Sequence, residues 1–214
     1  MSPGPLDPIT MQSFAIIDAE LAELGIRLPV EQYPLVRRAI HSTADFTLAR
    51  SLCFHPLAVK AGVAALQSAA PIVVDVNMVA AGVDRRRLEA LGSRLLCRVA
   101  DSDVAARSRE ARQTRSAAGM RAALLEAGAG AIVAVGNAPT ALREVLWLVD
   151  QELVRPALLV GVPVGFVDAV ESKAALMERD DVPWIAVEGR RGGSPVAVAL
   201  VNALLHLALP EVPA

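Results

Sequence analysis

The sequence has few aromatic residues, few cysteines and little net charge, and each shortage excludes something. Aromatic side chains make up only 3% of the 214 residues, so the hydrophobic content of 54% comes mainly from Ala, Val and Leu. A net charge of −2 provides no basic surface for nucleic acid or anionic membranes. Cys53 and Cys97 have no CxxC spacing and no neighbouring histidines, which predicts buried free thiols in a reducing cytoplasm.

Neither end of the chain indicates export or a membrane anchor. Residues 1–9 contain three prolines but no basic or apolar segment, so we expect an extended arm and no signal peptide. The longest apolar helical run, residues 196–209, contains Asn202 and His206 and is shorter than the roughly 20 residues of a membrane span. We expect a buried terminal helix there, and a cytoplasmic protein without membrane contact.

Five short aliphatic runs, separated by segments long enough for helices, predict an alternation of strands and helices. The runs cover residues 71–76, 95–100, 131–135, 157–162 and 184–187. Right-handed crossovers would join them into a mainly parallel five-stranded sheet between helical layers, a three-layer α/β/α sandwich of flavodoxin-like order. Residues 1–214 suit a single domain of this kind.

The first 70 residues differ from this alternation. They predict helices over residues 10–24, 32–43 and 56–68 and no strands. Such helices must cover a face or edge of the sheet, or form part of an interface with a partner. The surplus of apolar residues likewise indicates a subunit interface.

Three turns that follow predicted strands share small residues: GNAPTAL, GVPVGF and EGRRGGSP. Turns after parallel strands meet at the carboxyl edge of the sheet, where ligands of such folds bind. We expect Asn137 and Ser194 to cap the following helices and leave backbone N–H groups for a carboxylate or phosphate. A nucleotide is not indicated, since GxxxxGK[ST] and GxGxxG are missing. Asp75, at the end of the first run, is either an acid/base group or a cap.

The segment YPLVRRAIHSTAD predicts an amphipathic helix. Its apolar stripe, at i, i+3, i+4 and i+7, consists of Val36, Ala39, Ile40 and Thr43. Arg37, Arg38 and His41 fall together on another face. The two arginines disfavour a protonated imidazole until an anionic ligand compensates them, so ligand binding itself would load the proton. His41 is therefore the candidate proton-transfer residue, and the alternative is an incidental histidine on a solvated face.

Further cationic residues are expected near the same edge. QTRSAAGM places Arg115 at the start of the helix that follows the second strand. An arginine beside the positive end of a helix is unfavourable by about 0.3–1 kcal/mol when exposed, so we expect an anion to compensate it. Arg190 and Arg191 add charge after the last strand. Glu171 and Lys173 are expected on a solvated helix face.

The motifs of several other catalysts are missing, among them GxSxG, HExxH and clustered metal ligands. One histidine, several arginines and apolar walls instead predict a large, polyanionic, partly apolar ligand and simple proton chemistry.

Seven segments of the chain stand in the order in which they occur in one known family. They are QSFAIID, VRRAIHSTAD, DVNMVAAG, QTRSAAGM, GAIVAVGNAPTAL, GVPVGFVDAVESK and GRRGGSPVAVALVNALL. Together they resemble the precorrin-8X methylmutase family, also called cobalt-precorrin-8 methylmutase, over residues 8–209. The resemblance implies an α/β homodimeric isomerase of cobalamin (vitamin B12) biosynthesis that uses no cofactor and no metal. It further implies that a methyl group moves from C-11 to C-12 of a tetrapyrrole, giving hydrogenobyrinate or cobyrinate.

The resemblance also implies roles for individual residues. His41, in the RRxIHxxxD pattern, corresponds to the catalytic histidine that protonates the ring system. The residues implied in substrate binding are Ser13, Arg38, Arg115, Asn137 and Gly165. Two alternatives stay open: a non-catalytic tetrapyrrole carrier, and an enzyme acting on a phosphorylated metabolite.

Overall fold

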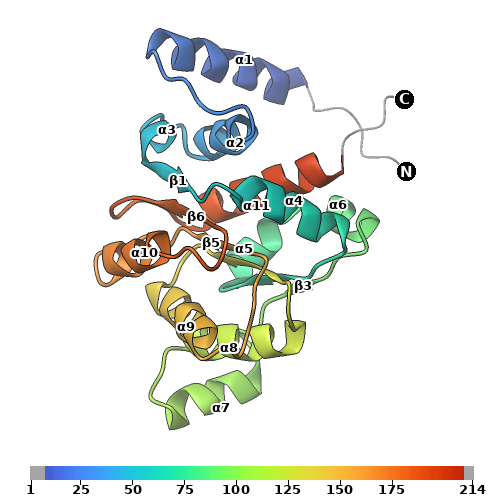
Figure 1. The fold of residues 1–214 in the computed structure, drawn as a ribbon, viewed down its shortest axis with the longest axis vertical. Coiled ribbons are helices and arrows are strands. Elements are labelled where there is room, and N and C mark those ends of the chain that lie inside the picture. Colours follow the sequence, from blue (N-terminus) through green and yellow to red (C-terminus); the bar gives the residue numbers. More distant parts are fainter. Residues whose placement is uncertain (1–7, 210–214) are drawn as a thin grey trace.

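A six-stranded sheet runs through the computed structural model, which describes residues 8–209 (Figure 1). The strands are β1 (Leu52–Phe54), β2 (Ile72–Val74), β3 (Leu95–Leu96), β4 (Ile132–Val135), β5 (Leu158–Gly161) and β6 (Trp184–Val187). Their order is β1-β6-β5-β4-β2-β3, and all neighbours are parallel except β1 and β6. Strands β2 to β6 are the five predicted ones, and their flavodoxin-like order is confirmed.

Strand β1 is a correction, because we expected no strand before residue 71. It pairs antiparallel with β6, with Leu52 opposite Val187. Three residues are too few to show a strand period, so only the pairing with a strand more than 100 positions away defines it. An antiparallel edge strand on an otherwise parallel sheet is common.

Helices cover both faces of the sheet, and neighbouring strand residues point to opposite cores. Ile132 belongs to one apolar cluster and Val133 to the other. The first face is covered by α4 (Ala58–Gln67), α5 (Asn77–Gly82), α6 (Arg85–Ala90) and α11 (Ser194–Ala208). The second is covered by α8 (Arg115–Ala127), α9 (Pro139–Asp150) and α10 (Ala169–Met177), with α7 (Ser102–Glu110) packed on α8. The buried terminal helix is confirmed as α11.

The N-terminal helices form an additional layer beyond α11 (Figure 1). They are α1 (Pro8–Glu23), α2 (Tyr33–Thr43) and α3 (Leu48–Ser51). Helix α2 packs directly on α11. Its predicted apolar stripe is correct except at Thr43, which is exposed and whose hydroxyl donates to the carbonyl of Ala39 at 2.9 Å.

The predicted extended arm is wrong at its end, because residues 8 and 9 already belong to α1. Residues 1–7 of that arm lie outside the described part of the chain. Within residues 8–209, none of the helices combines the length and the apolar character needed to cross a membrane.

Candidate functional site

The three small-residue turns lie side by side at the carboxyl edge of the sheet. The N–H of Val162, after β5, donates to the carbonyl of Val135, at the end of β4, at 2.9 Å. The N–H of Gly193, before α11, donates to the carbonyl of Val162 at 2.8 Å. The turns after β4, β5 and β6 are therefore joined in one continuous rim, as the sequence predicts.

Asp75 fixes the turn after β4. Its carboxylate is 1% exposed and accepts the backbone N–H groups of Gly136, Asn137 and Ala138 at 3.0, 2.8 and 2.9 Å. Burial raises the pKa of Asp75, and the three hydrogen bonds oppose that rise. Asp75 thus acts as a structural anchor here. The N–H groups expected to bind a ligand anion at this turn are already occupied, which corrects that expectation.

The predicted helix caps are also corrected. The N-cap residues are Ala138 for α9 and Gly193 for α11, and neither makes a side-chain cap bond. Asp75 accepts the N–H groups of the turn that precedes α9, and Asn137, one position before the N-cap, is exposed. Ser194 is already the first residue of α11.

Arg115 is the first residue of α8 and is exposed. Contrary to expectation, α7 intervenes between the second predicted strand, β3, and this helix. The hydroxyl of Thr114, the N-cap of α8, lies 2.7 Å from the hydroxyl of Thr140 in the first turn of α9. The starts of α8 and α9 are therefore adjacent, which places Arg115 near the turn that carries Asn137.

His41 lies on the exposed side of α2, next to a phenylalanine of α1. The Phe14 ring is buried and meets the His41 ring edge to face, with centroids 5.3 Å apart. The guanidinium carbons of Arg37 and Arg38 lie 4.2 and 5.7 Å from the centre of the same ring. Arg37 also pairs with Asp18 at 3.1 Å. The three residues of the predicted cationic face of α2 therefore all lie close to the ring of Phe14.

Sequence reasoning missed the role of Phe14. The available signal was its spacing, since Phe14, Ile17 and Leu21 form the buried stripe of α1 and fix that helix on α2. The contact of Phe14, at one end of this stripe, with His41 follows only from the packing of α1 on α2.

The structure brings Ser13 and His41 together at a cavity of about 260 Å³, here called the His41 cavity. Its lining includes Ser13, Ile16, Glu20, His41, Ala44 and Phe46. The Ser13 hydroxyl donates to the carbonyl of Ile9 at 2.9 Å. Pockets for small molecules usually measure roughly 300–1,000 Å³, so the His41 cavity is smaller than a typical binding pocket.

The loop after β6 connects the His41 layer with the rim. The Arg191 guanidinium bonds the Asp45 carboxylate and the Thr47 hydroxyl, which follow α2. Within the rim, the N–H of Gly165 donates to the carbonyl of Arg190 at 3.3 Å. Gly165 has a φ of 151°, a backbone conformation that suits glycine.

Phe166 follows Gly165 and is 85% exposed, with the Arg190 guanidinium 5.4 Å from the centre of its ring. Val164 and Val167 are exposed beside it in the same loop. The rim therefore carries an apolar surface next to a cation.

Lys173 contradicts the expectation of a solvated helix face, whereas Glu171 on the same helix is exposed as predicted. The Lys173 side chain is fully buried, and its ammonium donates to the carbonyl of Arg191 at 2.6 Å. Burial lowers the pKa of Lys173 to about 8. Lysine is rarely buried, so the local pattern gave no signal for this position.

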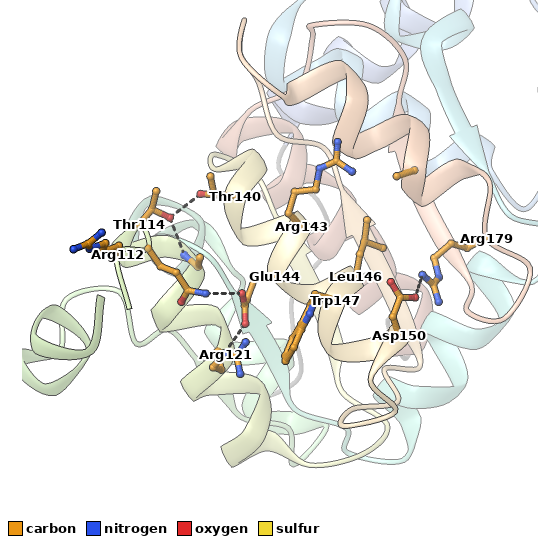
Figure 2. A pocket seen from close by; sticks show the side chains of 13 residues that line it. Arg112, Thr114, Arg121, Thr140, Arg143, Glu144, Leu146, Trp147, Asp150 and Arg179 are labelled. Carbon is orange, nitrogen blue, oxygen red and sulfur yellow. Dashed lines mark hydrogen bonds and ion pairs between the residues drawn. The ribbon is translucent and has the colours of Figure 1, made fainter. Parts of the chain in front are cut away.

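A groove of about 710 Å³ runs across α9 from α8 to α10, on the sheet face opposite α1 and α2 (Figure 2). Arg121 pairs with the buried carboxylate of Glu144 at 2.5 Å and stacks 4.5 Å from the ring centre of Trp147. Arg143 and Arg179, on the same groove, are each paired with an aspartate. Because carboxylates already match these arginines, the groove is a poor candidate for an anion site.

The predicted site residues thus fall into two groups. Ser13, Arg38 and His41 gather in the N-terminal layer, whereas Arg115 and Asn137 lie at the starts of α8 and α9. Gly165 lies between them in the rim. Among the described residues, no three His, Cys, Asp or Glu side chains are grouped so that they would hold a metal ion. Both cysteines are free thiols as predicted, but they are half-buried and not buried.

Comparison with known proteins gives one consistent result. The family model for precorrin-8X methylmutase matches residues 8–207. The cobalt-precorrin-8 methylmutase of Priestia megaterium is 46% identical over 208 residues, which cover 94% of this chain and 91% of that protein. The precorrin-8X methylmutase of Pseudomonas aeruginosa is 44% identical over 197 residues, 92% of this chain and 93% of that protein. A solved structure of precorrin-8x methyl mutase from Thermus thermophilus has a TM-score of 0.86 and 42% identity, covering 94% of this chain and 95% of that chain. The chain therefore belongs to the precorrin-8X methylmutase family and is a methyl-migrating isomerase of cobalamin biosynthesis.

Proposed function

We propose that this protein moves a methyl group from C-11 to C-12 of precorrin-8X, or of its cobalt complex, with His41 as the proton donor. The products would be hydrogenobyrinate or cobyrinate. The observation that carries the proposal is the position of His41, exposed at the mouth of a cavity that it shares with Ser13. Relatives named for either substrate match the chain at similar identity.

The proposed chemistry needs a proton and a fixed orientation. Protonation of the conjugated ring system by His41 withdraws electron density, so the bond from the methyl carbon to C-11 can break as the bond to C-12 forms. Because the reaction is an isomerisation, the proton is returned before the product leaves. General acid catalysis of this kind contributes typically 10²- to 10⁴-fold, and orientation of the substrate contributes further.

The substrate would be recognised through its carboxylates and its apolar ring. We assign Arg38 and Arg115 to charge-assisted hydrogen bonds with acetate and propionate groups. Ser13 contributes a hydroxyl, and Asn137 and Gly165 contribute wall positions in the rim turns. The exposed Phe166 ring supplies an apolar surface suited to a macrocycle.

We further propose that the enzyme is a homodimer. The His41 cavity is too small for a tetrapyrrole, and α1 beside it exposes Ile9, Met11 and Ile16 by 75%, 54% and 52%. Apolar patches of this kind usually mark an interface, and a second copy would complete the pocket. We also propose one domain over residues 1–214 and a cytoplasmic location, which the two free thiols favour.

The test is a visible spectrum of the protein mixed with precorrin-8X and, separately, with its cobalt complex. Conversion extends the conjugated system, so a new absorption band at longer wavelength should grow with time. A bound ligand that keeps its identity after extraction would indicate a carrier. Binding of inorganic phosphate without binding of corrinoids would indicate a phosphorylated-metabolite enzyme. Either result would overturn the proposal.

A further inference from the structure

Lys173 is a charged residue that the proposed chemistry does not use. The sequence holds two lysines, and Lys60 on α4 is exposed whereas Lys173 is completely buried. Burying a charge is unfavourable, and an apolar side chain of similar volume is often at least as stabilising in such a place. Packing alone therefore does not account for a lysine at this position.

The Lys173 ammonium supports a loop that has little freedom. It donates to the backbone carbonyl of Arg191 at 2.6 Å. Two positions further along, the N–H of Gly193 donates to the carbonyl of Val162 at 2.8 Å. Gly192 between them has a φ of 138°, and a Cβ there would overlap the Val162 carbonyl oxygen. The backbone on both sides of Gly192 is thus fixed by Lys173 and by the rim.

The side chain of Arg191 reaches from this loop to the segment that follows α2. Its guanidinium bonds the carboxylate of Asp45 and the hydroxyl of Thr47. The Asp45 carboxylate also accepts the N–H of Thr47 at 2.9 Å and its hydroxyl at 2.6 Å. The Asp45 carboxylate thus closes a turn over residues 45–47, and Arg191 ties this turn to the loop after β6.

Phe46, inside this turn, lines the His41 cavity, next to Ala44 at the end of α2. We propose that Lys173 is a positioning residue for the methyl migration, because through Arg191 it holds the turn of residues 45–47, and with it Phe46, as one wall of that cavity. The inference rests on the proposed function. A displaced wall would misalign the proton donor with the ring, and a misplacement of about 1 Å can lower a rate by roughly 10²-fold.

The structural part of this proposal is testable without substrate. Lys173→Met removes the ammonium, Arg191→Ala removes the guanidinium but keeps the backbone carbonyl, and Lys60→Met is the matched control. We expect amide hydrogen exchange in a peptide covering residues 41–47 to become about tenfold faster or more in the first two variants, and to stay unchanged in the control. Unchanged exchange in both would overturn the proposal.

The functional part is tested by turnover of precorrin-8X. For Lys173→Met and Arg191→Ala we expect kcat to fall by about 10- to 100-fold, while affinity for the product stays within about threefold. The double variant should fall no further than the worse single variant, since both residues act through one link. Arg191→Lys, which keeps a cation opposite Asp45, should recover part of the loss.

Each outcome separates the inference from the proposed function. Conversion by the wild type with undiminished kcat in both single variants overturns the positioning role and leaves the proposed function standing. Lower stability with normal kcat in the folded protein overturns it in the same way. No conversion by the wild type overturns both. If Lys173→Met does not fold, Arg191→Ala, whose side chain is exposed, decides the question.

Discussion

The carboxylate of Asp75 accepts the backbone N–H of Asn137 at 2.8 Å, although 62 positions separate the two residues in the chain. The N–H groups of Gly136 and Ala138 donate to the same carboxylate. One side chain from the end of β2 thus sets the conformation of the turn that leads from β4 into α9.

Asp75→Asn should destabilise the protein. The amide places an NH₂ group against backbone donors and leaves at least one buried N–H unpaired, so the free energy of unfolding should fall by about 3 kcal/mol. Urea denaturation at neutral pH measures this. Asp180→Asn, at an exposed position, is the control and should stay within about 0.5 kcal/mol of the wild type. A loss below about 1 kcal/mol for Asp75→Asn would contradict the anchoring role.

His41→Ala should fold and bind the corrinoid but lose nearly all turnover. Removal of the proton donor should lower kcat by on the order of 10²- to 10⁴-fold, measured from the growth of the product band. His55→Gln, a histidine outside the His41 cavity, is the control and should retain turnover. Wild-type turnover in His41→Ala would falsify the acid role.

Arg38→Ala and Arg115→Ala should act mainly on binding. Each should weaken the affinity for substrate and product by roughly 1.5–3 kcal/mol, through loss of a charge-assisted hydrogen bond to a carboxylate. Titration with the product measures the change, and Arg109→Ala at an exposed position of α7 serves as the control. Normal affinity combined with reduced stability would give the two arginines a structural role instead.

The protein should sediment as a dimer of about twice its chain mass of 22.5 kDa at micromolar concentration. Met11→Glu places a charge on the exposed apolar side of α1, so it should dissociate the dimer and depress activity together. Leu125→Glu, at an exposed position on α8 in the opposite layer, should do neither. A fully active monomer would rule out a shared pocket while leaving the family assignment intact.

Lys173 should give stability a pH dependence of defined sign. Its pKa is about 8 in the folded protein, against an ordinary value of 10.5. Between these values the unfolded chain binds a proton that the folded protein does not, so stability from this group rises with pH. Denaturation measures the free energy of unfolding of the wild type and of Lys173→Met. The difference between the two should shift in favour of the wild type between about pH 8 and 10.5. A pH-independent difference would mean that the ammonium is not desolvated.

The central strands were predictable because a parallel sheet covered on both faces consists of continuous apolar runs. The runs around Ile132, Leu158 and Trp184 are fully buried strands, as their composition indicates. The resemblance in QSF and RRxIHxxxD named Ser13 and His41, which do share a cavity.

The remaining features depend on contacts between distant parts of the chain. The turn before α9 is fixed by Asp75, the strand of Leu52 exists only through β6, and the buried ammonium of Lys173 finds its partner in the carbonyl of Arg191. None of these features can be predicted from the local sequence, because residue types and hydrophobic periodicity describe one segment and not the segments that pack against it. The volume of the His41 cavity likewise follows only from how α1, α2 and the segment after α2 pack.

The attachment of the N-terminal layer to the C-terminal part of the chain has a consequence for synthesis. Helix α2 buries its apolar side against α11, and Arg191 holds Asp45 across 146 positions. A growing chain emerges N-terminus first, so α2 leaves the ribosome long before α11 exists and its apolar side chains stay uncovered until then. A chain truncated ahead of α11 would leave them uncovered altogether. The turn beside the His41 cavity therefore gains the support of Arg191 only after residue 191 has been synthesised.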